Sequence, residues 1–138
     1  MTRRPLLILL LPLVLLCAAC KSGIAGRHSA IEPPTNDEIE GYYNRYATGD
    51  YAGYVDLMLS LDSMPAAYRQ QMIDLHKQHA CLQEAEVGHP VAWHVERVEA
   101  HDDGRMLNVF LAVTYDKEQR TELVMLPLVY DGQQWRLR

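Results

Sequence analysis

Cysteine is scarce in this sequence, and the few cysteines present are unevenly placed. The chain has three, Cys17, Cys20 and Cys81, and two of them fall within its first 20 residues. Cys81 is the single thiol of the remaining chain, so it cannot form an internal disulfide. The chain must therefore be stabilised by an apolar core rather than by cross-links. We expect Cys81 itself to be a half-buried small apolar residue near a helix end.

A long hydrophobic run is also missing. The segment from Pro5 to Leu16 is almost unbroken Leu, Ile, Val and Pro. It spans about a dozen residues, short of the roughly 18 to 20 that a membrane-spanning helix needs, and Pro12 disfavours a continuous helix further. This length fits the apolar centre of a signal peptide, and Arg3 and Arg4 supply the basic residues that precede it.

Excess positive charge is absent as well. Without Arg3 and Arg4, 11 basic residues stand against 18 acidic ones, a formal charge of −7. Nucleic acid and anionic lipid headgroups repel such a domain. The sequence therefore predicts no nucleic-acid partner and no membrane-binding basic face.

The segment Leu15 to Cys20 reads L-L-C-A-A-C and closes the apolar run. It resembles the bacterial lipobox, in which a peptidase cleaves before a lipidated cysteine, although Cys17 stands where that motif prefers an aliphatic residue. The resemblance implies a signal peptide at residues 1–19 and lipid attachment, with acyl chains such as palmitate, at Cys20. Lys21 stands where an aspartate would resemble the inner-membrane retention signal, which favours an outer-membrane lipoprotein facing the periplasm. A soluble secreted form and an uncleaved anchor are the alternatives.

The domain boundaries follow from composition and capping signals. Residues 20–34 are rich in Gly, Ser, Ala and Pro, which predicts a flexible tether, and residues 35–138 form the domain. Thr35 with Glu38 is a capping-box pattern. Helical spacing of apolar residues then predicts three helices, over about 35–48, 50–61 and 65–83. The stripe of the third helix consists of Tyr68, Met72, Leu75, His79 and Leu82.

After Gly88 the apolar period changes to that of strands. Val91, Trp93 and Val95 alternate, and a change of phase after them predicts a β-bulge near residues 96–97. Asp103-Gly104 and Asp131-Gly132 are hairpin signals. We therefore expect an α+β fold, in which three N-terminal helices pack on a curved four-stranded antiparallel sheet, a cone-shaped roll.

Two phrases carry a family resemblance. The first helix ends in T-G-D-Y (residues 48–51), and the chain closes with D-G-Q-Q-W-R (residues 131–136). Together with the element order they resemble the nuclear-transport-factor-like fold, which includes SnoaL-like and ketosteroid-isomerase-like proteins, and within it a domain-of-unknown-function family of small bacterial lipoproteins. The resemblance covers about residues 35–138 and implies a pocket between the sheet and the helices.

Aromatic side chains are the candidates for lining that pocket. The expected lining residues are Tyr42, Tyr46, Tyr54, Trp93 and Tyr115. The isomerase-like members of the fold use an Asp base and Tyr donors in an apolar cavity. Here the acidic residues fall mainly in turns and caps, so no catalytic residue is predicted. An open cavity with Asp, Glu or His at its floor would favour an enzyme, and a filled one would exclude it.

A metal site is the second chemical hypothesis. His76-x-x-His79 places two imidazoles on adjacent turns of the third helix, a spacing that metal sites use. His79 belongs to the apolar stripe and His76 does not, and no Glu follows the first histidine as in zinc proteases. We therefore expect neither a metal nor a cofactor.

The sequence thus predicts a lipid-anchored, non-catalytic domain of the bacterial cell envelope that binds a small apolar ligand or a partner protein. The alternatives are an isomerase- or dehydratase-like enzyme that uses a Tyr and a carboxylate, and a homodimer formed through the sheet face. Alternation on the second strand makes Phe110 and Ala112 the candidates for exposure on that face.

Overall fold

The computed structural model describes residues 30–138, so the predicted signal peptide and Cys20 lie outside the described residues. Helices come first, as α1 (Asn36–Ala47), α2 (Tyr51–Val55), the 3-10 turn η1 (Leu59–Leu61) and α3 (Ala66–Val87). The strands follow as β1 (Pro90–Ala100), β2 (Met106–Tyr115), β3 (Thr121–Tyr130) and β4 (Trp135–Leu137), with the turn η2 (Lys117–Gln119) before β3. The predicted α+β class and four-stranded antiparallel sheet are confirmed.

The sheet is a meander in the order β1-β2-β3-β4. The pairing of β1 with β2 runs from Pro90↔Tyr115 to Ala100↔Leu107, and its register shifts between Val95 and Arg97, where the sequence predicted a bulge. β2 pairs with β3 over nearly its full length. β4 is much shorter and pairs with β3 from Leu128 to Tyr130.

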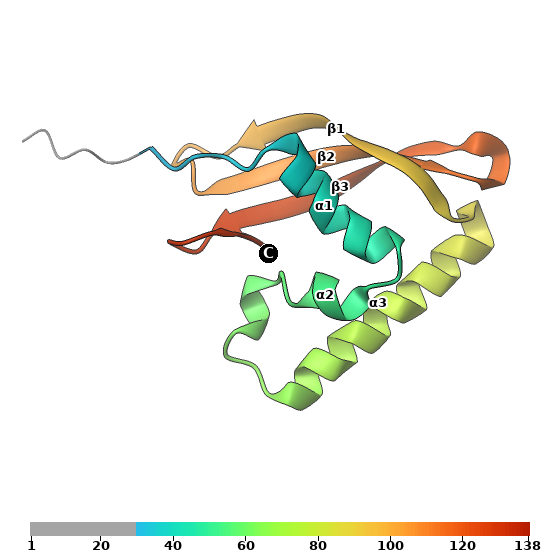
Figure 1. The fold of residues 1–138 in the computed structure, drawn as a ribbon, viewed down its shortest axis with the longest axis horizontal. Helices are drawn as coiled ribbons and strands as arrows, with labels where there is room; N and C mark the ends of the chain where they lie inside the picture. The colour runs from blue at the N-terminus through green and yellow to red at the C-terminus, as the bar shows by residue number, and fades with distance from the viewer. Residues whose placement is uncertain (1–29) are drawn as a thin grey trace, which may run out of the picture.

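The helices differ in how they meet this sheet. α1 starts at a complete capping box, in which the Thr35 side chain accepts from the Glu38 amide and the Glu38 carboxylate accepts from the Thr35 amide. It packs on β1, whereas α3 packs mainly on α2 and runs past the sheet (Figure 1). In the described part of the chain, no helix is long and apolar enough to cross a membrane.

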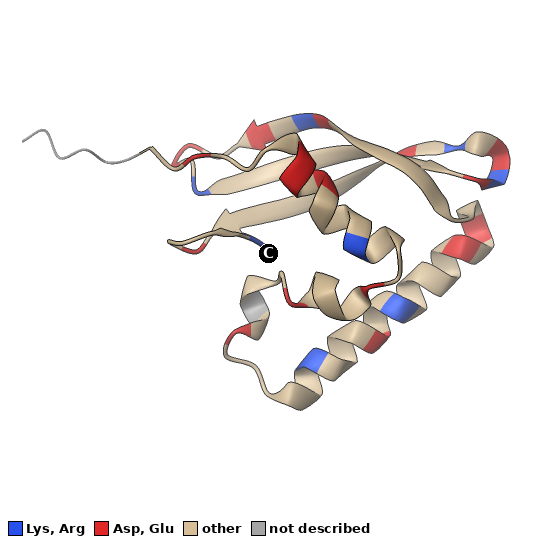
Figure 2. Ribbon diagram, viewed as in Figure 1, with Lys and Arg blue, Asp and Glu red and all other residues tan. Residues whose placement is uncertain are grey.

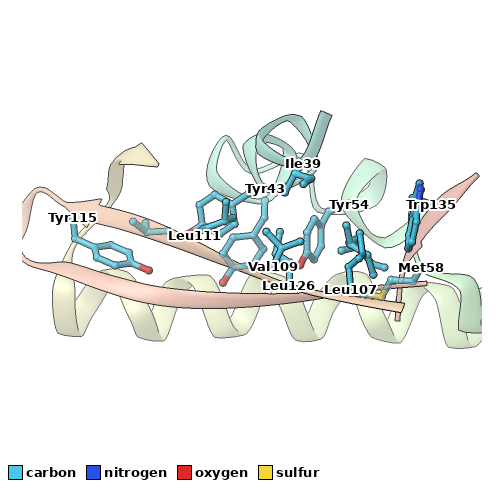
Figure 3. Close-up of a cluster of buried hydrophobic side chains, with 14 of the residues drawn as sticks. Ile39, Tyr43, Tyr54, Met58, Leu107, Val109, Leu111, Tyr115, Leu126 and Trp135 are labelled. Carbon is cyan, nitrogen blue, oxygen red and sulfur yellow. The ribbon is translucent and has the colours of Figure 1, made fainter. Parts of the chain in front are cut away.

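The core fills the space between α1, α2 and the inner face of β2 and β3 (Figure 3). β2 supplies every second residue to it, so that five of its side chains are buried: Leu107, Val109, Leu111, Val113 and Tyr115. Trp135 on β4 closes one end, and its indole Nε1 donates to the Glu32 carbonyl at 2.8 Å. Because Ile31 also packs against this core, residues 31 and 32 contact the folded domain.

Most of the apolar stripe of α3 lies outside the core, although Met72 packs against it. Leu75 is 54% exposed, Leu82 is 64% exposed and Tyr68 is also exposed. Cys81, expected to be half-buried, is exposed too. The helix continues past residue 83 to Val87, where the peptide turns at Gly88 with φ of 92°. The helical period was thus predicted correctly, but it does not mark buried residues here.

The outer face of the sheet also differs from expectation. Ala112 is buried, and Phe110 is partly covered by the Arg97 guanidinium, whose Cζ lies 3.9 Å from the ring centroid. The exposed apolar residues of this face are instead Leu123 and Met125 on β3.

Candidate functional site

An open cavity of about 350 Å³ lies between α3, β3 and the aromatic residues of α1 and α2. Its lining comprises Tyr43, Tyr46, Tyr54, Leu75, His76, His79, Gln83, Val124, Met125 and Leu126. The cavity exists because α3 packs mainly on α2, so that space remains between this helix and β3. Charged residues lie in turns, along β1 and at intervals along α3 (Figure 2), and no Asp, Glu, Lys or Arg lines this space.

One wall of the cavity is aromatic. Tyr43 and Tyr46 lie one helical turn apart on α1, with ring centroids separated by 5.8 Å. Tyr54 of α2 adds a ring 5.4 Å from Tyr46. The His76 imidazole stands edge-on to Tyr54, at 5.2 Å and an interplanar angle of 82°. Such edge-to-face pairs are stabilising, and they fix the orientation of the rings in this wall.

Two hydrogen bonds connect α3 to the body of the domain beside the cavity. The Tyr46 hydroxyl and His79 Nδ1 lie 2.7 Å apart. One helical turn further on, Gln83 Nε2 donates to the Tyr115 hydroxyl at 2.8 Å. Polar contacts therefore fasten the part of α3 that borders the cavity, in place of the apolar packing that its sequence predicted.

The electrostatics of the cavity favour uncharged groups. Burial raises the pKa of the Tyr54 phenol to about 12 and raises the pKa of the Tyr46 and Tyr43 phenols as well. Burial, with a smaller effect of the neighbouring His79, lowers the pKa of His76 from its ordinary value of 6.5. Near neutral pH the tyrosines and His76 are therefore uncharged.

Two polar atoms of the lining residues are buried without a hydrogen-bond partner. They are the Tyr43 hydroxyl oxygen and His76 Nε2. The His76 ring packs edge-to-face with the Tyr54 and Tyr46 rings. Both atoms are shielded from solvent and are therefore not open to a ligand in the cavity.

The predicted lining residues are distributed over three places. Tyr46 and Tyr54 line the cavity. Tyr42 instead lies in a separate groove beside Trp135, and its hydroxyl donates to the Trp135 carbonyl. Trp93 packs edge-on against Tyr43, with centroids 5.6 Å apart. Tyr115 is fully buried and reaches the site through its bond with Gln83.

Four lining residues on α3 were not predicted: Leu75, His76, His79 and Gln83. The sequence places them within three turns on one side of a helix, but this pattern alone does not distinguish a cavity wall from a core face. Within residues 30–138 no group of three or more His, Cys, Asp or Glu side chains is arranged to hold a metal ion.

Comparison with solved structures identifies the architecture. A structure from Campylobacter jejuni described as an NTF2-like transpeptidase superposes with a TM-score of 0.57, covering 73% of this chain and 94% of that one. The chain has the NTF2-like cone fold. The sequence identity is 8%, so the likeness shows the fold alone. No family model matches the chain, and no curated protein matches it.

Within this NTF2-like fold, the short β4 leaves the cone incompletely closed. Its three residues, Trp135–Leu137, lie at one end of β3, and the rest of β3 borders the cavity. The wall that faces α3 is therefore open, and Leu75 and Met125, both more than half exposed, stand beside the opening.

Proposed function

We propose that this protein is a lipid-anchored, non-catalytic domain of the bacterial cell envelope that binds a small, uncharged apolar ligand in the cone. The observation that carries the proposal is the open cavity, which has aromatic and aliphatic walls and no Asp, Glu, Lys or Arg among its lining residues. Its volume of about 350 Å³ lies at the lower end of the range for small-molecule sites.

The lining determines the chemical class of the ligand. A charged ligand would lose its hydration in the cavity and gain no opposite charge there, and burying an uncompensated charge is costly. An apolar ligand gains free energy from burial against Val124, Leu126 and the tyrosine rings. The Gln83 amide and the His79 imidazole can hydrogen-bond one or two neutral polar groups of the ligand at the edge of the cavity.

The same electrostatics support a binding role over catalysis. The raised pKa values of Tyr46 and Tyr54 keep these phenols protonated, and an efficient general acid or base has a pKa near the working pH. An isomerase mechanism with a Tyr and a carboxylate also needs an acidic residue, and none lines the cavity.

The binding proposal is tested with a neutral fluorescent probe, N-phenyl-1-naphthylamine. Leu75→Trp enlarges an exposed side chain at the cavity and should weaken probe binding at least tenfold. Leu123→Trp is the matched control, because Leu123 is similarly exposed, at 57%, and lies outside the lining. Equal affinity in both variants and the wild type, or no binding by the wild type, would contradict the proposal.

The anchor is tested separately. Cys20→Ala should move the full-length protein from the membrane fraction to the soluble periplasmic fraction, since acyl chains at this residue provide the attachment. The melting temperature of the released domain should equal that of the wild-type domain. Continued membrane association of the variant would contradict lipid attachment at Cys20.

An acid–base enzyme is the second candidate function, favoured by the histidines at the cavity and by the 2.7 Å contact between Tyr46 and His79. Its test is exchange of the α-hydrogens of cyclohexanone, a small neutral ketone, in deuterated water, followed by NMR. Enzyme-dependent exchange that is lost in Tyr46→Phe would support catalysis. Exchange at the uncatalysed rate leaves the binding proposal standing.

A homodimer through the outer sheet face is the third candidate, because Leu123 and Met125 are exposed there. Met125→Lys would place a charge in such an interface and should convert a dimer to a monomer in sedimentation experiments. A wild-type protein that is monomeric at high concentration would rule this candidate out.

A further inference from the structure

The edge of β3 that faces away from β2 is largely unpaired in the described residues. β4 covers it from Leu128 to Tyr130, and the Arg138 amide adds a bond to the Pro127 carbonyl at 3.0 Å. From Thr121 to Leu126 no strand pairs with this edge in residues 30–138. The strand therefore offers a free row of backbone donors and acceptors beside the cavity.

The pairing pattern shows which backbone groups point to the free edge. The Tyr130 amide donates toward β2, to the Arg105 carbonyl, whereas the Pro127 carbonyl points to the opposite edge and accepts from Arg138. Successive residues of a strand alternate between its two edges. The amides and carbonyls of Leu123 and Met125 therefore point to the free edge, while those of Val124 point to β2.

The middle of this edge, residues 123–126, lacks the usual protection. Free edges in soluble proteins generally carry charged residues, prolines or bulges that prevent pairing with another chain. Residues 123–126 read L-V-M-L, and Leu123 and Met125 are more than half exposed. Glu122 before them is paired with Arg120 at 2.8 Å, and Pro127, which lacks an amide hydrogen, marks the point at which β4 takes over.

The cavity lies on the inner side of the same edge. Val124 and Leu126 turn their side chains inward, and both line the cavity together with Leu75 of α3. A strand added here would continue the curved sheet toward α3. Every second side chain of that strand would then enter the space that Tyr46 and Tyr54 border.

We propose that the free edge of β3 binds an extended segment of a partner protein by β-strand addition. The segment carries apolar side chains at alternate positions, which occupy the cavity, while its backbone pairs with Leu123 and Met125. Main-chain hydrogen bonds supply affinity and a pocket for alternate side chains supplies specificity in this mode of recognition. The inference rests on the proposed function in one respect, that the cavity accepts apolar groups.

A second copy of this chain fits the edge less well than a single segment. If the β3 strands of two copies paired at this edge, the second copy would bring its own α3 there. The α3 helix of the first copy already borders the space beside the edge (Figure 1). An extended segment brings no such helix.

The test uses a phage-displayed library of random nonapeptides selected on the immobilised domain. We expect enriched peptides with apolar residues at alternate positions, and addition of the best peptide should protect the Leu123 and Met125 amides from hydrogen exchange. A peptide N-methylated at alternate residues should bind at least tenfold more weakly. Enrichment of helical spacing, or equal binding by the methylated peptide, would overturn the inference.

A variant of the edge provides the control. Leu123→Pro removes an amide hydrogen that no strand in residues 30–138 uses, at a residue outside the cavity lining. The fold should therefore persist, and peptide binding should fall at least tenfold. Because the naphthylamine probe needs the cavity and not the edge, it should still bind this variant. If the wild type binds the probe but selects no peptide, the inference is refuted and the proposed function stands. If the wild type does not bind the probe, the proposed function is refuted.

Discussion

The Tyr46 hydroxyl and His79 Nδ1 meet at 2.7 Å and join α1 to α3 at the edge of the cavity. Because the Tyr46 phenol keeps its proton at neutral pH, it is positioned to donate to the imidazole. This bond takes the place of the apolar contact that the helical stripe of α3 predicted for His79.

Tyr46→Phe should therefore lower the free energy of unfolding by about 1 kcal/mol, the usual net contribution of one hydrogen bond. The measurement is urea denaturation of the wild type and the variant. Tyr68→Phe is the control, because the Tyr68 side chain is exposed near the start of α3. This substitution should leave the stability unchanged. Equal losses in the two variants would show that the Tyr46–His79 bond contributes nothing.

His76 should make stability depend on pH. Its pKa is lowered in the folded protein relative to 6.5, the value expected in the unfolded chain, so the unfolded state binds the proton more readily. The stability that this group contributes is complete above pH 6.5 and is lost as the pH falls from 6.5 through the lowered folded pKa. His76→Gln should flatten this part of a melting profile, and His101→Gln, in an exposed turn, should not.

Arg136 should be a strong determinant of stability. Its guanidinium donates to the Leu57 and Met58 carbonyls at 3.2 and 3.1 Å, and to Asp62 at 2.7 Å, while its side chain is 11% exposed. The single ammonium group of lysine cannot reproduce the hydrogen bonds of the planar guanidinium. Arg136→Lys should therefore lower the free energy of unfolding by about 2 kcal/mol. Arg69→Lys, at a pair with Asp56 that is exposed on both sides, should have little effect on thermal unfolding.

Gly88 should not tolerate a side chain. It ends α3 with φ of 92°, and a Cβ would collide with the Asp116 carboxylate, which accepts from the His89 amide at 3.0 Å. Gly88→Ala should lower stability by about 2 kcal/mol, since both strain and a displaced hydrogen bond contribute. Gly41→Ala has free space on α1 and should instead raise stability by about 1 kcal/mol. A calorimetric melting temperature that changes in the same direction in both variants would contradict this account.

The sequence predicted the features that depend on near neighbours. The Thr35–Glu38 capping box and the alternation of β2 follow from spacing alone, and both are present. The phase change along β1 likewise marks the register shift between Val95 and Arg97. Such patterns are local, so a single sequence is enough to find them.

The cavity depends on relationships that spacing does not encode. The stripe of α3 has the same period whether it faces a core or an open space, so the exposure of Leu75 and Leu82 was not foreseeable. Tyr42 and Tyr43 are adjacent in sequence, yet Tyr43 lines the cavity and Tyr42 bonds to Trp135. Contacts of Ile31 and Glu32 with the core are similarly long-range, and the composition of residues 20–34 does not reveal them.

The central claim is that an uncharged apolar ligand occupies the cone, and methyl NMR tests it most directly. N-phenyl-1-naphthylamine should shift the methyl signals of the lining residues Val124 and Leu126 in a saturable titration. The methyl signals of Leu123, on the outer face of the same strand, should stay in place. Saturable shifts at Leu123 without any at Val124 and Leu126, or no shifts at all, would contradict the account.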